Sequence, residues 1–307
     1  MPCYNPLMSS QSKNARGVYF ILTSALMFGS YGVWSKLIGD SFGVFFQGWT
    51  RALIISIILL PILIWKKQLI PIAKKDWKWM SVFLIFTSLT QAPIYYAFTH
   101  MDIGSASVLF FVTMLLTMYA VGYLFLGEKV SKVKITSFFL AITGLYLSFS
   151  FSIKTFSLLA ALMAILNGIA SGGEVSFSKK LSNNYSALYI TWLSWLIVFI
   201  TNAPISILIG EVQHLPTINL IWLYQLIYVF VGLFAFGFVI AGLKYVEASI
   251  GGLLGLLEVI FSIIFGILIF GESLEQKALM GAILVIAAAA LPHVAKIYRK
   301  TPTKSPA

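Results

Sequence analysis

The chain contains an internal repeat with a fixed offset of 144 residues. The segment FLGEKV at Phe125–Val130 reappears as IFGESL at Ile269–Leu274, and each copy follows about twenty apolar residues, enough for one membrane span. The same offset, without a gap, aligns Gly29 with Gly173, Lys36 with Lys180, Leu37 with Leu181, Ala97 with Ala241, Ser105 with Ser249 and Gly122 with Gly266. Repeated apolar segments are typical of transporters that hold a substrate between two related halves.

The composition indicates an integral membrane protein. Hydrophobic residues make up 59 % of the 307 positions and charged residues 10 %, against about 45–50 % and about 25 % in a soluble domain. The net charge of +11 comes mostly from short clusters between apolar runs and not from one basic face, so nucleic acid is not an expected partner. The single cysteine, Cys3, excludes an intramolecular disulfide.

The apolar runs predict an all-α protein with ten transmembrane helices. The first run is longer than the core of a signal peptide and no small-residue cleavage site follows it, so we expect it to be retained as a span. The ten expected spans are Gly17–Ile38, Phe42–Trp65, Trp77–Thr99, Gly104–Leu126, Lys132–Phe151, Phe156–Ser178, Tyr185–Ile209, Leu220–Leu243, Ala248–Phe270 and Gln276–Tyr298. They give a cytoplasmic tail (1–16), two five-helix repeats (17–151 and 152–298) and a second cytoplasmic tail (299–307).

The distribution of basic residues predicts the orientation. If the N-terminus is cytoplasmic, three of the 21 basic residues (Lys36, Lys154 and Lys277) lie outside and Arg51 lies within a span, which leaves 17 on the cytoplasmic side. Cytoplasmic loops carry such an excess of Lys and Arg. Both termini are therefore expected in the cytoplasm. Because each repeat has five spans, the second repeat enters the membrane inverted relative to the first.

The pattern resembles the drug/metabolite transporter superfamily, EamA type, over nearly all of the chain after Gly17. In each half of such proteins a helix rich in small residues ends in Gly-Glu and another helix follows. The corresponding segments here are IGSASVLFFVTMLLTMYAVGYLFLGEKVSKVKITSFFLAITGLYLSF and ASIGGLLGLLEVIFSIIFGILIFGESLEQKALMGAILVIAAAAL. The chain departs from the family at Leu115 and Val259, where members commonly carry a proline in the fourth and ninth helices.

The resemblance also implies which helices line a central cavity. In the family the third and eighth helices do so, which makes Gln91, Tyr95 and Tyr228 expected wall residues, together with Trp34 of the first span. Aromatic residues in membrane helices also serve as packing or interface anchors.

Glu258 is the sharpest candidate among the polar residues. It lies about nine residues into the ninth span, near the bilayer midplane. Its helical neighbours are Gly251, Gly255, Ser262 and Gly266, and this stripe of small residues permits close approach of a helix or ligand. An ionised carboxylate at that depth costs about 3 kcal/mol on insertion scales. The residue is interpreted as a proton-coupling carboxylate, as a ligand for a substrate cation, or as a structural partner of Arg51.

Arg51 lies equally deep in the second span, with Gln47 one turn away. Because arginine does not lose its charge, its side chain must face the bundle and find an anion or carbonyl groups. The alternatives are structural pairing and binding of a substrate carboxylate.

Glu174 and Asn167 share a polar stripe in the sixth span. Glu174 lies nearer the cytoplasmic end, where Lys180 is a candidate structural partner, and the repeat aligns it with Ser30. The two halves are therefore electrically unequal, as would suit recognition of a polar substrate.

Glu128 and Glu272 occupy matched positions of the repeat, but the inverted topology places them at opposite sides of the membrane. They are interpreted as caps of the helices that follow them. No cofactor is expected, because the histidines are dispersed and no phosphate-binding G-x-x-x-x-G-K-[ST] loop or metal motif is present.

These features favour a secondary transporter over an enzyme, for which no nucleophile or metal cluster is visible. A passive channel or a lipid scramblase is the alternative. We expect a multi-pass carrier in the cell inner membrane, an exporter or exchanger of a small organic metabolite such as an amino acid or a related amine or carboxylate. Alternating access is the expected mechanism and the proton a candidate coupling ion. No pattern specifies an oligomeric state.

Overall fold

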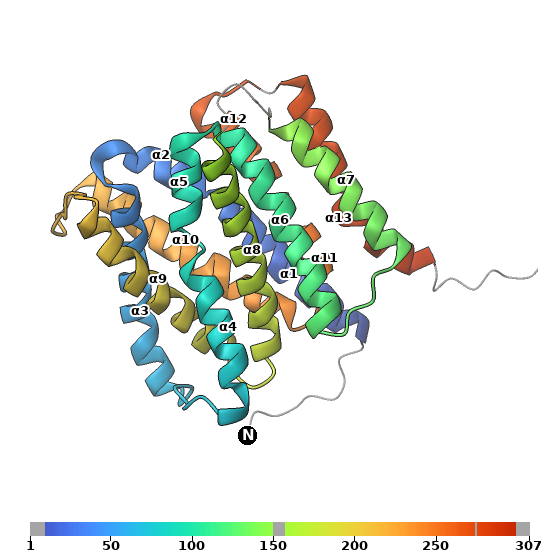
Figure 1. Cartoon of the computed structure of the whole chain (residues 1–307), viewed down its shortest axis with the longest axis horizontal. Helices are drawn as coiled ribbons and strands as arrows, with labels where there is room; N and C mark the ends of the chain where they lie inside the picture. The colour runs from blue at the N-terminus through green and yellow to red at the C-terminus, as the bar shows by residue number, and fades with distance from the viewer. Residues whose placement is uncertain (1–9, 150–156, 274, 299–307) are drawn as a thin grey trace, which may run out of the picture.

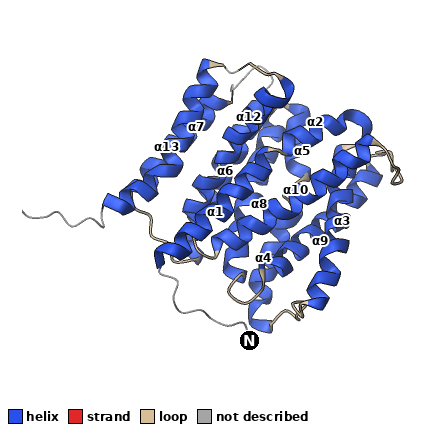
Figure 2. Ribbon diagram, turned by 180° about the vertical axis from the view of Figure 1, so that it is seen from behind, coloured by secondary structure: helices blue, strands red, loops and turns tan. Residues whose placement is uncertain are grey.

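The computed structural model describes residues 10–149, 157–273 and 275–298, and every regular element in this part of the chain is helical (Figures 1 and 2). The α-helices are α1 (Ser10–Gly29), α2 (Tyr31–Ile38), α3 (Val44–Trp65), α4 (Trp77–Ser88), α5 (Ala92–His100), α6 (Ile103–Phe125), α7 (Lys132–Ser148), α8 (Leu158–Leu181), α9 (Ala187–Leu208), α10 (Leu220–Leu243), α11 (Ala248–Gly255), α12 (Leu257–Phe270) and α13 (Gln276–Tyr298). Short 3₁₀ helices, η1 (Gly39–Ser41) and η2 (Lys74–Asp76), lie in connections.

Nine segments of the described chain are long and apolar enough to cross a membrane. Three of these spans consist of two helices each, namely α1 with α2, α4 with α5, and α11 with α12. The tenth expected span corresponds to α7, which has 17 residues and runs beside α13 at one edge of the bundle (Figure 1). Its expected continuation to Phe151 lies outside the described residues, as do the expected tail 299–307 and residues 1–9 of the expected tail 1–16. Residues 10–16 of that tail form the start of α1. The all-α multi-pass prediction is confirmed.

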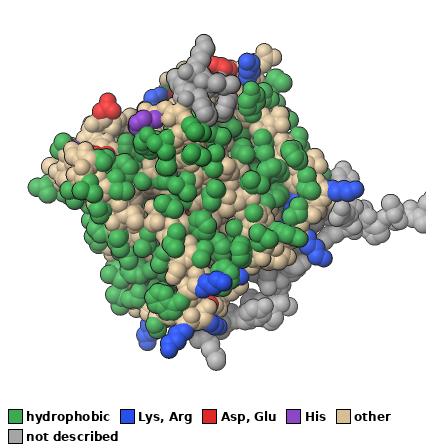
Figure 3. All heavy atoms as spheres, viewed as in Figure 1, with side chains coloured by type: hydrophobic (Ala, Val, Ile, Leu, Met, Phe, Trp, Pro, Cys, Tyr) green, Lys and Arg blue, Asp and Glu red, His purple; other side chains and the backbone are tan. Residues whose placement is uncertain are grey.

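The surface has the distribution of polarity that a bilayer requires. Apolar side chains cover much of the face seen in Figure 3, and Lys and Arg side chains gather near its ends. Exposed apolar residues include Ile57, Leu116 and Phe139. A soluble protein of this size would not expose so continuous an apolar surface.

The helix contacts reproduce the two-fold relation between inverted repeats. The second span α3 packs on its counterpart α9, and α7 packs on its counterpart α13. The contact of α6 with α8 is mirrored by that of α11 and α12 with α1. Likewise, the contact of α4 and α5 with α8 is mirrored by that of α10 with α1. Exchanging the two halves therefore reproduces these main contacts.

Three spans are interrupted, whereas the sequence analysis predicted continuous helices. The first span breaks at Ser30, the third between Ser88 and Ala92, and the ninth at Leu256. The counterpart spans α8, α10 and α6 are continuous. Of the two positions where the family commonly has proline, Leu115 lies inside continuous α6, whereas Val259 follows the break at Leu256.

Carboxylates clamp the α3–α9 pair at both ends. At one end Asp76 accepts hydrogen bonds from Asn184 Nδ2 at 3.0 and 3.1 Å and from the Tyr185 hydroxyl at 3.1 Å. At the other end Glu211 accepts from the backbone N–H groups of Phe45 and Phe46 at 3.0 and 2.7 Å, and thereby caps α3. We call the end that contains Asp76 the basic end. It holds the connections 66–76, 126–131, 182–186 and 244–247. Connections expected on one side of the membrane thus meet at one end of the bundle.

We predict that the basic end is cytoplasmic, because Lys and Arg cluster in its connections. Alkaline phosphatase fused after Lys134 should remain inside the cell and be inactive, whereas the same enzyme fused after Glu211 should be exported and active. The reverse pattern of phosphatase activity would contradict this orientation.

Candidate functional site

The centre of the bundle contains a buried arginine surrounded by aromatic rings. Arg51, on α3, is 3 % exposed. Its guanidinium carbon lies 4.0 Å from the ring centre of Tyr228, 5.2 Å from that of Tyr31 and 5.3 Å from that of Trp195. Tyr95 also interacts electrostatically with the guanidinium. Aromatic faces attract a cation, and such contacts are worth about 2 kcal/mol when the groups are desolvated.

No carboxylate pairs with Arg51. All ten acidic residues of the chain belong to the described part, and none lies within 4.0 Å of the guanidinium nitrogens. Several buried polar atoms of the same region have no hydrogen-bond partner among the described residues. These atoms are Arg51 Nε, the Tyr31 hydroxyl, Trp195 Nε1, Thr191 Oγ1 and Gln91 Oε1. Buried polar groups are normally satisfied, so this concentration indicates a place where an absent polar ligand or water completes the bonds.

Gly232 of α10 lies close to the side chains around Arg51. A β-carbon there would lie 3.1 Å from the Tyr31 hydroxyl and 3.3 Å from Arg51 Cδ and from the Trp195 ring. Any larger residue would therefore intrude on the space between these side chains. Gln91 adds a carbonyl oxygen that approaches Gly48, one turn before Arg51 on α3.

Glu258 lies in the first turn of α12, just after the break in the ninth span. It is half-buried and forms no ion pair with Arg51, so the direct structural pair is not formed. Tyr31 interacts electrostatically with both Arg51 and Glu258. The breaks in the first and ninth spans meet here, because a β-carbon on Gly29 would collide with Phe261 and with the Glu258 carbonyl group. Glu258 is thus positioned on an interrupted helix near the tyrosine that contacts Arg51.

Trp34 and Tyr95 lie at the edge of the same region. Trp34 Nε1 donates a hydrogen bond to Ser30 Oγ at 3.1 Å, at the break in the first span. Its ring packs on an aromatic cluster that includes Tyr228. Tyr95 packs edge-on against Phe45, with ring centres 5.3 Å apart. Of the expected wall residues, Tyr228 and Tyr95 interact with Arg51, and Trp34 packs in the aromatic cluster that holds Tyr228.

Glu174 and Asn167 lie in a second polar region, at the break in the third span. Asn167 Nδ2 donates to the Leu89 carbonyl at 3.2 Å and so satisfies an acceptor in that break. Glu174 accepts from Thr87 and Ser194 hydroxyls. The expected pairing with Lys180 is wrong, since Lys180 Nζ donates to the Phe125 carbonyl at 3.0 Å and lies 4.0 Å from the Trp79 ring centre.

Sequence reasoning missed Tyr31, Thr191 and Trp195. The repeat contained a usable signal for two of them, because the 144-residue offset aligns Arg51 with Trp195 and Gln47 with Thr191. Since α3 and α9 pack across the two-fold relation, residues at matched positions face one another. Tyr31 had no such signal, because the repeat aligns it with Val175.

Comparison with known proteins identifies the family. The model of the EamA-like transporter family matches residues 15–150 and again residues 158–292, once in each half. The chain belongs to the EamA-like transporter family. No curated protein matches it. A solved structure described only as "Crystal structure of protein" shares the fold, with a TM-score of 0.72 and 12 % identity over 94 % of this chain and 99 % of that one.

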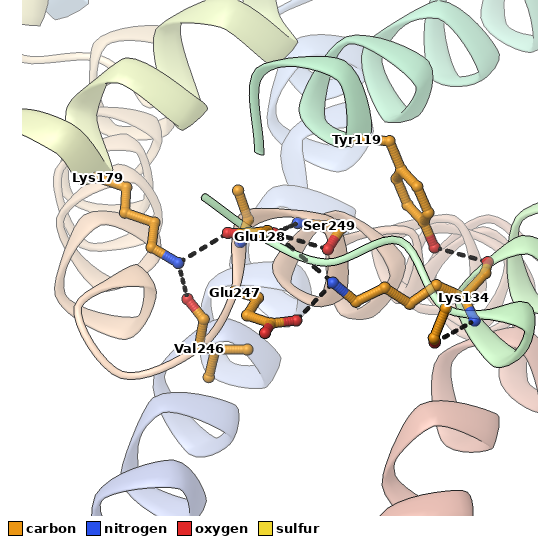
Figure 4. Close-up of polar contacts among 9 residues, drawn as sticks. Tyr119, Glu128, Lys134, Lys179, Val246, Glu247 and Ser249 are labelled. Atoms are coloured by element: carbon orange, nitrogen blue, oxygen red, sulfur yellow. Dashed lines mark hydrogen bonds and ion pairs between the residues drawn. The ribbon is translucent and has the colours of Figure 1, made fainter. Parts of the chain in front are cut away.

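In this EamA-like transporter a network of charges closes the basic end (Figure 4). Glu128, in the connection after α6, accepts hydrogen bonds from Lys179 Nζ at 3.0 Å and from the Ala248 N–H at 2.5 Å. Ser249 adds its N–H at 3.2 Å and its hydroxyl at 2.8 Å. Lys134 Nζ pairs with Glu247 at 2.5 Å. Glu128 is therefore a helix cap, but of α11 in the other repeat. The expectation that it caps the helix after it was wrong, since Ser131 caps α7.

The matched residue Glu272 behaves differently. It pairs with Lys36 at 2.9 Å, and both side chains are more than half exposed. The two ends of the bundle are therefore closed unequally.

Acidification should weaken the closure around Glu128. Burial opposes its ionisation, but Lys179 and the Ala248 N–H outweigh burial and lower the pKa of the Glu128 carboxyl below its usual 4.5. A carboxyl whose pKa is lower in the folded protein than in the unfolded chain stabilises the fold at any pH above the unfolded-state pKa. This stabilisation is lost as the pH falls through the folded-state pKa.

We predict that Glu128→Gln lowers the free energy of unfolding by about 1–3 kcal/mol at pH 7, and with it the melting temperature. The difference in stability between the two proteins should shrink below pH 4.5. Thermal unfolding of the two proteins across a pH series measures it. Glu272→Gln is the matched control and should change stability by less than about 1 kcal/mol. Parallel pH profiles for wild type and Glu128→Gln would contradict the assignment.

Proposed function

We propose that the protein is a secondary carrier of a small organic metabolite that bears a carboxylate, such as an amino acid. The observation that carries the proposal is Arg51, a buried and permanently charged group without an acidic partner. An ionisable residue inside a membrane bundle is by default a candidate functional residue. A carboxylate forms two parallel hydrogen bonds with a guanidinium, which gives both energy and orientation.

The surrounding residues support an amino-acid-like shape for the solute. Tyr31, Tyr228 and Trp195 offer aromatic faces, and the unpartnered hydroxyl and indole N–H groups offer further donors. Glu258, near Tyr31, is a carboxylate that would attract an ammonium group. A zwitterion with its carboxylate on Arg51 and its ammonium toward Glu258 satisfies both charges.

The architecture around this site supports alternating access as the mechanism. Inverted repeats hold it between two related halves, and the interrupted first and ninth spans meet beside it. In transporters of this kind, one half rocks against the other around a fixed midplane site. We further propose that the carrier resides in the cell inner membrane with both termini in the cytoplasm and works as an exporter or exchanger.

A thermal-shift screen of the purified protein against amino acids, monocarboxylates and amines tests the solute class. Carboxylate-bearing compounds should raise the melting temperature, and a ligand at about 100 times its dissociation constant stabilises the fold by about 2.7 kcal/mol. Arg51→Gln should lose this shift. Lys277→Gln, which removes an exposed basic residue of α13, should keep it. A shift that persists in Arg51→Gln would contradict the proposed role of Arg51.

Counterflow in proteoliposomes then distinguishes a carrier from a passive channel. A carrier exchanges labelled for unlabelled solute and transiently accumulates the label, whereas a channel only equilibrates it. Lipid-scrambling activity without counterflow would favour the scramblase alternative.

A further inference from the structure

The proposed carrier leaves one buried acidic residue without a role. Glu174, on α8, is 7 % exposed and no cation lies within 4.0 Å of its carboxyl. The two lysines that follow it on the same helix are held elsewhere. Lys179 binds Glu128 and the Val246 carbonyl, and Lys180 binds the Phe125 carbonyl.

The packed helices bring no other charged partner to Glu174. The contacts that Glu174 makes among the described residues are hydrogen bonds from Thr87 and Ser194, and it forms no ion pair there. Titratable side chains on the helices against α8 have other surroundings. On α4, Lys78 lies over Trp79, and on α5 Tyr95 interacts with Arg51 and Tyr96 stacks on His100. On α6, Tyr119 donates to the Lys134 carbonyl and Tyr123 is exposed. On α9, Tyr189 stacks on Tyr185, and on α10 Tyr228 lies over Arg51 and Tyr224 packs on the aromatic cluster. The helix α11 carries no titratable residue.

The hydrogen bonds around Glu174 have room for one additional proton. Glu174 Oε1 lies 2.5 Å from Ser194 Oγ and 3.1 Å from Thr87 Oγ1, and Thr87 Oγ1 lies 2.9 Å from the Phe83 carbonyl oxygen. These are three contacts between oxygens, whereas the two hydroxyls supply two hydrogens. If Glu174 is ionised, Thr87 donates either to Glu174 or to Phe83, and the other contact lacks a hydrogen. If Glu174 is protonated, its own hydrogen fills the Thr87 contact, and all three are satisfied.

Glu174 is also linked mechanically to the site around Arg51. Thr87 precedes the break in the third span, after which α5 carries Tyr95. Ser194 precedes Trp195 on α9. A change in protonation at Glu174 therefore changes the hydrogen bonding of α9, which carries Trp195, and of α4, which leads through the break to α5 and Tyr95. The repeat places Ser30 at the matched position, so the other half has no second carboxyl there.

A cavity of about 400 Å³ lies at the basic end, near the C-terminal end of α8, and its lining includes Lys179, Lys180 and Asp76. Lys179 follows Glu174 by five residues on α8, which corresponds to about 7.5 Å along the helix axis.

We propose that Glu174 binds the proton that drives solute movement, at a site separate from the one around Arg51. This inference rests on the proposed carrier function. In this scheme Glu258 binds the solute. Protonation of Glu174 changes its hydrogen bonds to Thr87 and Ser194, and these bonds link it to α4 and α9.

Infrared spectroscopy of the purified protein tests proton binding without any solute. The carbonyl stretching band of a protonated carboxylic acid should appear and disappear in a pH titration of wild type, and Glu174→Gln should lose this component. Glu258→Gln is the control and should retain it. Because Glu174→Gln could destabilise the bundle, Ser194→Ala and Thr87→Val provide a second route. Each removes one hydroxyl partner and should shift the frequency of the Glu174 band. A spectrum unchanged in Glu174→Gln, or unshifted in both hydroxyl variants, would overturn the proposal.

Transport in proteoliposomes tests coupling, with a mixture of radiolabelled amino acids as the probe. In Glu174→Gln, accumulation driven by a pH gradient should be lost relative to counterflow of the same mixture, while Lys277→Gln keeps the wild-type ratio. An unchanged ratio in Glu174→Gln would overturn the coupling role. If wild type shows no counterflow of the mixture, the proposed function fails for amino acids, and the infrared titration still decides whether Glu174 binds a proton.

Discussion

A guanidinium that cannot lose its charge lies in the middle of an apolar bundle, and the other features of the site depend on it. Arg51 is buried on α3, where this helix packs on α9 across the two-fold relation of the repeats. An unpaired arginine at mid-depth costs about 3 kcal/mol on insertion scales. Aromatic faces from three helices offset part of this cost, because the face of each ring is electron-rich. They leave Arg51 Nε without a hydrogen-bond partner among the described residues, which is why an anionic solute fits there.

The clamps at the two ends of the α3–α9 pair keep this arrangement in place. Asp76 binds the residues just before α9, and Glu211 caps α3. The helices that contact this pair most are α10, which is continuous, and α4, which belongs to the interrupted third span. The interrupted first and ninth spans meet each other at Gly29 and Phe261. The closure at Glu128 belongs to other helices, since it joins the α6–α7 connection of one repeat to α8 and α11 of the other.

Much of the fold could be predicted from the sequence because membrane spans are a matter of length and polarity. The helix breaks were harder. Pro93, in the first turn of α5, was a usable signal for the third-span break. The breaks at Ser30 and Leu256 have no nearby proline and follow Gly29 and Gly255, a weaker signal because glycine also occurs inside membrane helices. Tertiary context also decided the partners of charged residues. Glu128 caps a helix of the other repeat, and Lys180 turns away from Glu174 to a carbonyl of α6. Position along the chain does not determine such partners.

A crystal structure of the protein soaked with 4-bromobenzoate would test the central claim most directly, because its ring-bound bromine is not displaced by side chains and gives an anomalous signal that locates the ligand. The account predicts a bromine peak inside the bundle, with the carboxylate on the Arg51 guanidinium and between the Tyr31 and Tyr228 rings. The peak should disappear in Arg51→Gln crystals soaked in the same way. A peak retained in Arg51→Gln, or bromine bound only at the lysines of the basic end, would contradict the account.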